Sequence, residues 1–153
     1  MFVPFILGSK VDVPHAEKIK EILEDFGVKC KIHVSSAHKV PEKTLKIINH
    51  YNKMKGPIVF VTGAGRSNAL SGLVSANTHF PVIACPPFSD KADYLANIHS
   101  TIQMPSETPA MTVVDPGNAA QAVLRILSLC DEKLKSKVEK HMKIVQDSFD
   151  VDL

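Results

Sequence analysis

His38 and Lys39 end a short polar segment, residues 35–39, whose residue types suit proton transfer and phosphate binding. An apolar, β-branched run at 30–34 stops directly before this segment. The Pro-Glu pair at 41–42 is favoured in a first helical turn, which needs no proline N–H and whose dipole favours a carboxylate. The segment is therefore predicted to lie at the carboxyl end of a strand, where open α/β sheets bind ligands. A histidine there can take up and return a proton near neutral pH, while serine and lysine side chains can hold a phosphate.

Two further polar segments follow apolar runs that are predicted to be strands. Residues 8–12 come after the first run, and in them Ser9 offers a hydroxyl and an amide while Asp12 can accept from sugar hydroxyls. Residues 63–68 follow the central run, and their two glycines allow tight turns before a residue that can cap the next helix, Ser67 or Asn68. Backbone amides at such a helix start suit an anion or a polarised carboxylate. Neither segment has the spacing of a Walker loop or a dinucleotide-binding fingerprint, so a nucleoside triphosphate or a dinucleotide is not indicated.

Each of these segments also has an ordinary structural interpretation. Ser9 and Asp12 are typical helix-capping residues, the glycines are typical of turns, and Arg66 is compatible with a surface ion pair. Convergence favours the functional interpretation, because parallel strands end at the same edge of a sheet and would bring all three segments together. We therefore expect a site for a small phosphorylated ligand. The other histidines are predicted to be solvated and show no metal-ligand spacing; they are His15, His33, His50, His79, His99 and His141.

Strands alternate with helices along the chain, which is typical of a parallel sheet covered on both faces. The sequence predicts a three-layer α/β/α doubly wound domain over 1–130, with a mainly parallel five-stranded sheet of the flavodoxin-like or Rossmann-like kind. A C-terminal helical tail of the same domain is predicted over 131–153. No element is predicted between the fourth and fifth strands. Strands are expected at 3–7, 29–34, 58–61, 81–85 and 109–114, and helices at 13–26, 42–53, 68–76 and 116–129.

The tail carries apolar residues at three- and four-residue spacing on a highly charged helix. Such an apolar stripe needs a surface to cover it, either on its own domain or on another subunit, and the sequence leaves both possibilities open. The stripe consists of Leu134, Val138, Met142, Val145 and Phe149.

Composition limits the partners and the compartment. The chain has 153 residues, a net charge of +2, 44% apolar residues and 22% charged residues, which is ordinary for a globular domain. The small, evenly distributed charge gives no reason to expect nucleic acid or a membrane surface, and the apolar run at 1–7 is too short for a signal peptide or a membrane span. Cys30, Cys85 and Cys130 are widely spaced without a CxxC pair, which favours a reducing, cytoplasmic location and builds no zinc site.

Six short motifs together are similar to those of one enzyme family over nearly the whole chain. They are Gly8-Ser9-x-x-Asp12, Phe26-Gly27, Ser36-Ala37-His38-Lys39, the run at 64–72, Pro81-Val82-Ile83 and Gln103-Met104-Pro105. On these motifs the chain resembles the phosphoribosylaminoimidazole carboxylase family of purine biosynthesis, PurE. The family has two branches. The His38-Lys39 pair and the Ala-Gly-Arg-Ser-Asn run at 64–68 resemble the branch that includes the carboxylase domain of the animal bifunctional enzyme.

That resemblance implies addition of carbon dioxide to carbon 4 of 5-aminoimidazole ribonucleotide (AIR), giving 4-carboxy-5-aminoimidazole ribonucleotide without ATP, biotin or metal. The sister branch instead moves a carboxylate from the exocyclic nitrogen to the same carbon, so N5-carboxyaminoimidazole ribonucleotide mutase activity is the alternative. Because the aminoimidazole is an enamine, carbon 4 is already nucleophilic, and orientation together with a general base suffices. No cofactor is therefore expected, and the resemblance also implies a homo-octamer.

The resemblance further implies roles for individual residues. His38 would be the proton shuttle, acting as base in carboxylation and as acid in the reverse direction. The 5′-phosphate would be bound by Ser9, Ser36 and Lys39, and Asp12 would accept from the ribose hydroxyls. The ring and carboxylate end would be lined, through backbone amides and polar side chains, by Gly65, Arg66 and Ser67.

Two other classes of protein share this alternation of strands and helices. A signalling receiver domain needs an aspartate at the end of the central strand, where this chain has Val61-Thr62-Gly63. A flavin-binding electron carrier could use the first polar segment, but the chain has no tryptophan and only two tyrosines to stack on a flavin. The residues therefore favour the carboxylase interpretation over both.

Overall fold

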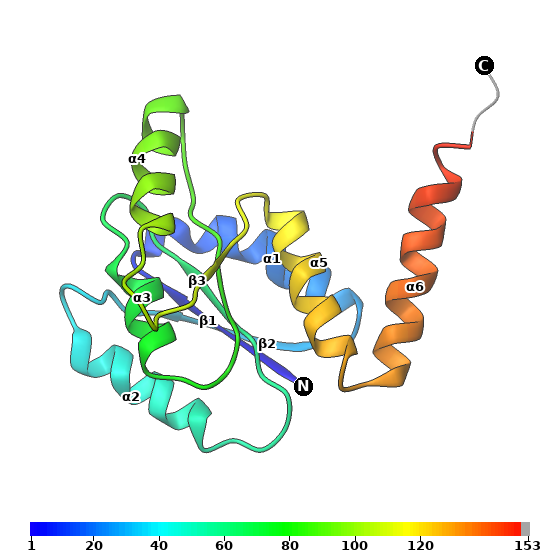
Figure 1. Cartoon of the computed structure of the whole chain (residues 1–153), viewed down its shortest axis with the longest axis horizontal. Helices are drawn as coiled ribbons and strands as arrows, with labels where there is room; N and C mark the ends of the chain where they lie inside the picture. The colour runs from blue at the N-terminus through cyan, green and yellow to red at the C-terminus, as the bar shows by residue number, and fades with distance from the viewer. Residues whose placement is uncertain (151–153) are drawn as a thin grey trace.

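The computed structural model describes residues 1–150, which form one sheet of parallel strands with helices on both sides (Figure 1). The strands are β1 (Phe2–Leu7), β2 (Lys29–Val34), β3 (Phe60–Gly63), β4 (Val82–Ala84) and β5 (Met111–Thr112). They are parallel throughout and lie in the order β2-β1-β3-β4-β5, with Phe5 opposite Ile32 on one side and Val61 on the other. This order confirms the predicted doubly wound, flavodoxin-like fold, whose winding reverses between β1 and β3.

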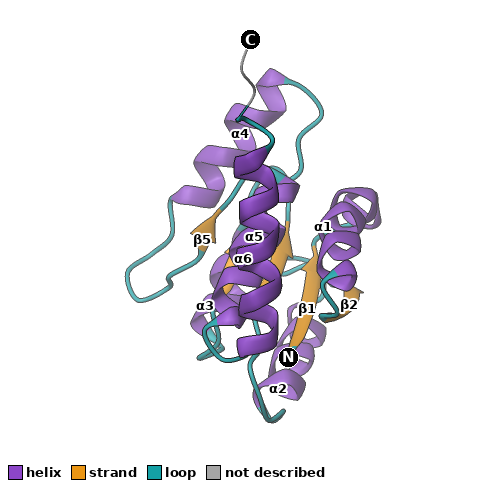
Figure 2. Cartoon of the chain, turned by 90° about the vertical axis from the view of Figure 1, so that its right-hand side faces the viewer, coloured by secondary structure: helices purple, strands orange, loops and turns teal. Residues whose placement is uncertain are grey.

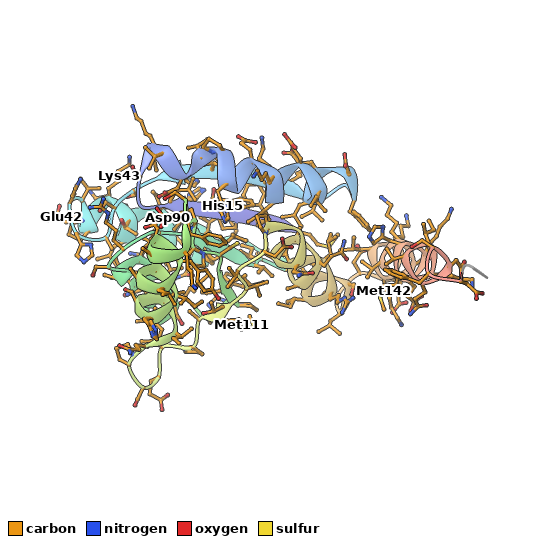
Figure 3. All side chains as sticks on the ribbon, turned by 90° about the horizontal axis from the view of Figure 1, so that it is seen from above. His15, Glu42, Lys43, Asp90, Met111 and Met142 are labelled. Carbon is orange, nitrogen blue, oxygen red and sulfur yellow. The ribbon has the colours of Figure 1, made fainter. Side chains whose placement is uncertain are left out.

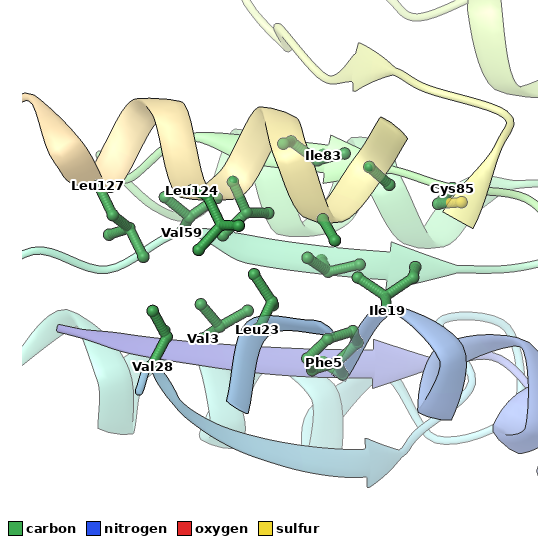
Figure 4. Packing of buried hydrophobic residues seen from close by; sticks show 14 of the residues in the cluster. Val3, Phe5, Ile19, Leu23, Val28, Val59, Ile83, Cys85, Leu124 and Leu127 are labelled. Atoms are coloured by element: carbon green, nitrogen blue, oxygen red, sulfur yellow. The ribbon is translucent and has the colours of Figure 1, made fainter. Parts of the chain in front are cut away.

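Helices cover both faces of the sheet (Figure 2). They are α1 (Val13–Asp25), α2 (Pro41–Asn52), α3 (Ala69–Ala76), α4 (Lys91–Ile102), α5 (Pro116–Ser128) and α6 (Glu132–Asp147), and a short 3-10 helix spans Lys10–Asp12. Side chains of β1 alternate between the faces, so Phe5 belongs to the core under α1 and α5, and Ile6 to the core under α2 and α3. Figure 4 shows Leu23 of α1 and Leu124 of α5 directed at the first of these cores. No helix within residues 1–150 is both long and apolar enough to span a membrane.

Side-chain caps explain where the last two helices begin. Asp115 accepts from the Asn118 amide at 2.8 Å at the start of α5, and Asp131 accepts from the Leu134 amide at 2.7 Å at the start of α6. Such a cap satisfies one of the amides that a helix start leaves unpaired, and its removal costs about 1 kcal/mol. These caps therefore fix where α5 and α6 begin, and residues 129–131 form the short connection between the two helices.

The helix α4 occupies the segment for which the sequence predicts no element, and that prediction is wrong. Its start is well specified, because the Asp90 carboxylate accepts from the Asp93 amide at 2.9 Å. Its apolar residues give no clear signal, since Leu95 is 47% exposed and Ile102 is 56% exposed. The helix is instead held by polar contacts with other segments, which a periodicity argument does not detect.

Four of the five strands differ in their bounds from the prediction: β1 and β4 by a residue at one or both ends, and β3 and β5 by more. The central strand β3 lies two residues later than the expected 58–61, because Ile58 forms only an isolated bridge with Phe2. The expected strand 109–114 is reduced to the two residues of β5, because the neighbouring β4 has only three residues to pair with.

The tail helix α6 is anchored along its first half only. Leu134 and Val138 are buried in the core shared with α1 and α5, and Met142 packs against that core from a half-buried position. Further along, Val145 and Phe149 are exposed, the latter by 84%, where α6 stands away from the sheet (Figure 1). The domain's own core therefore covers the first half of the predicted stripe. The last residues of the predicted tail, 151–153, lie outside the described residues.

Candidate functional site

A cleft of about 880 Å³ opens at the edge of the sheet where β1, β2 and β3 end. Its walls include the segments that follow these three strands and the first turns of α1 and α4. This is the switch point between β1 and β3, where open α/β sheets bind their ligands. The structure brings all the predicted site residues to this one cleft: Ser9, Asp12, Ser36, His38, Lys39, Gly65, Arg66 and Ser67.

Ser9 and Asp12 hold the first segment in a fixed turn. The Ser9 amide donates to Asp12 Oδ2 at 3.0 Å, and the Ser9 hydroxyl accepts from the Val11 amide at 3.4 Å, so both residues do act as caps. Asp12 is only 7% exposed; burial raises the pKa of its carboxyl, and the hydrogen bond from the Ser9 amide opposes that effect. Every buried side-chain oxygen within residues 1–150 has a hydrogen-bond partner. The second oxygen of Asp12 has none there, so it is accessible from the cleft and free to accept.

The second segment is a tight turn that leaves His38 and Lys39 exposed. The Ser36 hydroxyl accepts from the Lys39 amide at 3.3 Å, which fixes the turn on which both side chains stand. Beneath it, the buried hydroxyls of Ser35 and Thr44 lie 2.9 Å apart and join the turn to α2. The His38 ring forms no hydrogen bond within residues 1–150, so both of its nitrogens are available to a ligand.

The third segment is held in place by α4. Arg66 has a φ of 59°, in the left-handed region, and its amide donates to Asn97 Oδ1. Two residues later the Asn68 amide donates to Ser100 Oγ at 2.6 Å. Of the two predicted caps for the following helix, Asn68 forms the bond, because its side chain accepts from the Ser71 amide at 3.1 Å.

The sequence analysis missed the walls that α1 and α4 contribute to the cleft. Figure 3 labels His15 at the start of α1 and Asp90 at the start of α4, the two helices whose first turns border the cleft. The acidic residues at 90 and 93 have the spacing of a helix-capping pair, which would have indicated α4. No local signal indicates which of its side chains turn inward. The missed lining residues are Pro14, His15, Lys18, Pro87, Phe88, Ser89, Asp93 and Asn97.

The prediction that the remaining histidines are solvated is wrong for His15, His33 and His141, the last of which is half-buried against the Phe26 ring. His15 is half-buried with its Nε2 at 3.3 Å from Cys85 Sγ, and His33 is half-buried with its Nε2 at 2.7 Å from the Tyr51 hydroxyl. Burial is the largest effect on both imidazoles and lowers the pKa of each. His15 lines the cleft, whereas His33 does not.

The charges of the cleft suit a ligand with an anionic group and hydroxyls. Three cationic side chains, Lys18, Lys39 and Arg66, line it together with the carboxylates of Asp12 and Asp93. The cations attract an anion, and a carboxylate can order hydroxyls by accepting from them. With an exposed imidazole on the same wall, these groups define an α/β enzyme that acts on a small anionic substrate at the switch point of its sheet.

Residues 2–148 match the family model described as AIR carboxylase, and the chain belongs to this family. The resemblance drawn from the sequence motifs is thereby confirmed. The chain is 52% identical to the phosphoribosylaminoimidazole carboxylase of Archaeoglobus fulgidus over 133 residues, which cover 87% of this chain and 72% of that protein. It is 39% identical to the human bifunctional phosphoribosylaminoimidazole carboxylase/phosphoribosylaminoimidazole succinocarboxamide synthetase over 136 residues, 89% of this chain and 32% of that protein.

Solved structures agree with these sequence relatives. The crystal structure of Treponema denticola PurE superposes with a TM-score of 0.89 at 37% identity and covers 99% of both chains. The phosphoribosylaminoimidazole carboxylase of the same organism is 39% identical over 150 residues, which are 95% of this chain and 94% of that protein. The similarity thus extends over the whole domain, including α6, and is not confined to the cleft.

Proposed function

We propose that this enzyme carboxylates AIR at carbon 4 with carbon dioxide in de novo purine biosynthesis, without ATP. Membership of the AIR carboxylase family supports the reaction class. The observation that carries the assignment to this cleft is the convergence on one cavity of three strand-end segments, which bear Ser9, His38 and Arg66 respectively. A cavity of that size is in the range that binds small ligands.

The chemistry needs no redox partner and no leaving group other than a proton. The electron pair of the enamine at carbon 4 forms the new bond to the carbon of CO2, and one C=O π pair moves onto oxygen to give the carboxylate. The proton on carbon 4 then passes to the neutral imidazole of His38, and the pair of the broken C–H bond returns to the ring. Holding the ring beside CO2 and placing a base next to the proton are the two tasks of the protein.

The remaining residues position the nucleotide. Ser9, Ser36 and Lys39 bind the 5′-phosphate, because two hydroxyls and one ammonium stand on neighbouring strand-end turns. Asp12 accepts from the ribose hydroxyls through the oxygen that the Ser9 amide leaves free. The carboxylate end of the ring is bound by the turn formed by Gly65, Arg66 and Ser67.

The mutase reaction is the alternative, and one pair of assays distinguishes it from direct carboxylation. Purified enzyme is supplied with AIR and bicarbonate-derived CO2 in one mixture, and with the N-carboxylated isomer under CO2-depleted conditions in the other. A carboxylase forms product in the first mixture and uses the isomer only as fast as it decarboxylates spontaneously. Efficient conversion of the isomer would assign the mutase reaction, and inactivity in both mixtures would contradict the proposed function.

We also propose a homo-octamer in the cytoplasm. All three cysteines are free, and Cys130 is exposed, which fits a reducing compartment. The exposed side chains of Val145, near the end of α6, and Phe149, just after it, form an apolar surface that a neighbouring subunit can cover. In this arrangement the tail belongs to the domain at its start, where Leu134 is buried, and to a subunit contact around Val145 and Phe149. Sedimentation velocity of the purified enzyme tests the assembly, and a monomer at micromolar concentration would contradict it.

A further inference from the structure

We propose that Asn97 is a positioning residue that shapes the turn at 65–67 into the binding site for the carboxylate formed on the substrate. The proposal rests on the proposed function and deepens it, because it concerns the same cleft. Asn97 lies on α4, outside the three strand-end segments, and is 1% exposed. Its side chain lines the cleft and bonds to Arg66 of the turn, which lies 31 residues earlier in the chain.

The carboxamide of Asn97 joins two walls of the cleft. Its Oδ1 accepts from the Arg66 amide, and its Nδ2 donates to the Pro87 carbonyl at 2.6 Å. The orientation of the carboxamide is fixed by these partners, because an amide can only donate and a carbonyl can only accept. The turn and the segment after β4 are thereby held at one spacing by a residue in the middle of α4.

This bond decides which amides of the turn remain available. The Arg66 amide is bound to Asn97 and the Asn68 amide is bound to Ser100. The amides of Gly65 and Ser67 have no acceptor within residues 1–150. Successive amides around a residue in the left-handed region form a concave site for an anion, and Arg66 at φ 59° is such a residue.

The turn also depends on Asn97 for its shape. A non-glycine residue in the left-handed region is retained only where its surroundings hold it, and the hydrogen bond from the Arg66 amide to Asn97 supplies such support. At Gly65 an added Cβ would lie 3.2 Å from Asn97 Nδ2, which is closer than most real Cβ contacts. The backbone at Gly65 therefore packs directly against the Asn97 carboxamide. Without Asn97 the turn that carries the two free amides loses this support.

The expected effect of losing Asn97 on catalysis depends on the stage of the reaction at which the substrate carries a carboxylate. AIR carries no carboxylate, whereas the transition state and the product do, so a misdirected turn weakens their binding and leaves AIR binding unchanged. Asn97→Ala is therefore expected to lower kcat about 30-fold or more, with the KM for AIR within about threefold of the wild-type value. Isothermal titration should give an affinity for the carboxylated product about tenfold weaker or more, with AIR affinity nearly unchanged.

Two variants on the same helix complete the test. Ser100→Ala removes a hydrogen bond to the neighbouring residue Asn68 and not to the turn, so it is expected to bind AIR and product in the wild-type ratio. Asn97→Asp keeps an acceptor for the Arg66 amide, but it sets a carboxylate oxygen against the Pro87 carbonyl and adds a negative charge beside the turn, so it should weaken product binding at least as strongly as Asn97→Ala. If Asn97→Ala does not fold, as judged by circular dichroism, the comparison of Asn97→Asp with Asn97→Ser takes its place.

The outcomes separate the two proposals. Equal weakening of AIR and product binding in Asn97→Ala, or the same loss in Ser100→Ala, would overturn the role of Asn97 while the wild type remains an active carboxylase. A wild type that neither carboxylates AIR nor binds the carboxylated product would instead refute the proposed function on which the inference rests.

Discussion

The imidazole Nε2 of His15 lies 3.3 Å from the Sγ of Cys85, which joins the first turn of α1 to the residue that follows β4. Burial raises the pKa of the Cys85 thiol to about 12, so the thiol stays protonated, and its sulfur also lies 3.5 Å from the Val114 carbonyl. With the thiol proton directed at that carbonyl, the sulfur accepts from His15. One wall of the cleft is therefore tied to the core by a neutral histidine.

Stability should decrease as the pH falls, because the folded state holds His15 and His33 with lowered pKa values. Well above pH 6.5, as at pH 7.5, both side chains are largely neutral in folded and unfolded chains. As the pH falls, the unfolded chain binds protons first, so the free energy of unfolding declines until the pH has passed the lowered values. Urea unfolding at pH 7.5 and pH 5.5 measures this decline.

Substitution of the same histidines provides the control for that experiment. The double variant His15→Gln/His33→Gln should show a clearly smaller decline than the wild type. His99→Gln removes an exposed histidine of α4 and should retain the full decline. An unchanged decline in the double variant would mean that other groups cause the pH dependence.

His38→Asn should abolish turnover while the nucleotide still binds. The imidazole is exposed and has no hydrogen-bond partner within residues 1–150, so its loss removes the base without disturbing packing. General base catalysis contributes about 10²- to 10⁴-fold, and we expect a loss of kcat in that range. Steady-state kinetics together with titration of AIR check this, and near-normal turnover would remove His38 from the mechanism.

Lys39→Ala should chiefly raise the KM for AIR. Its ammonium is expected to bind the phosphate equally in ground and transition states, and a charge-assisted hydrogen bond of about 1.5–3 kcal/mol corresponds to about 10- to 100-fold in KM. Lys10→Ala is the matched control, because Lys10 is exposed and does not line the cleft. A loss of kcat at unchanged KM would contradict the phosphate role of Lys39.

The start of α6 and the segment just after its end should respond differently to substitution. Leu134 is 2% exposed in the core, so Leu134→Ala is expected to lower the free energy of unfolding by about 2–4 kcal/mol. Phe149 is 84% exposed, so Phe149→Ser should leave the domain stable and weaken subunit association. Chemical unfolding and sedimentation velocity measure the two effects, and an unaltered assembly in Phe149→Ser would exclude that side chain from the subunit contact.

Much of the fold and of the cleft was predictable from local patterns. The apolar run at 3–7 and the glycine after the first helix mark elements by composition alone, because buried strands and helix ends have strong residue preferences. The strand-end segments with Ser9, His38 and Arg66 could be placed at one edge, because parallel strands necessarily end together. Their roles toward the substrate stay predictions.

Other features depend on contacts between distant parts of the chain. The helix α4 has exposed apolar residues and is held by polar bonds, so its sequence carries little of the signal that reveals a buried helix. Half-burial of His15 depends on Cys85, 70 residues away, and neither residue type indicates the pairing. The same holds for the bond between Asn97 and Arg66.

The sequence by itself determined the order of the strands and of the helices other than α4. It also determined the chemical types of the side chains at the ends of β1, β2 and β3, because those features depend on short-range preferences and on the geometry of parallel sheets. Only the tertiary structure decided which amides of the third segment are bound and which are free, and how far the tail is covered. Those outcomes depend on hydrogen bonds and packing between residues far apart in the chain, whose partners are specified by the whole fold and by no local pattern.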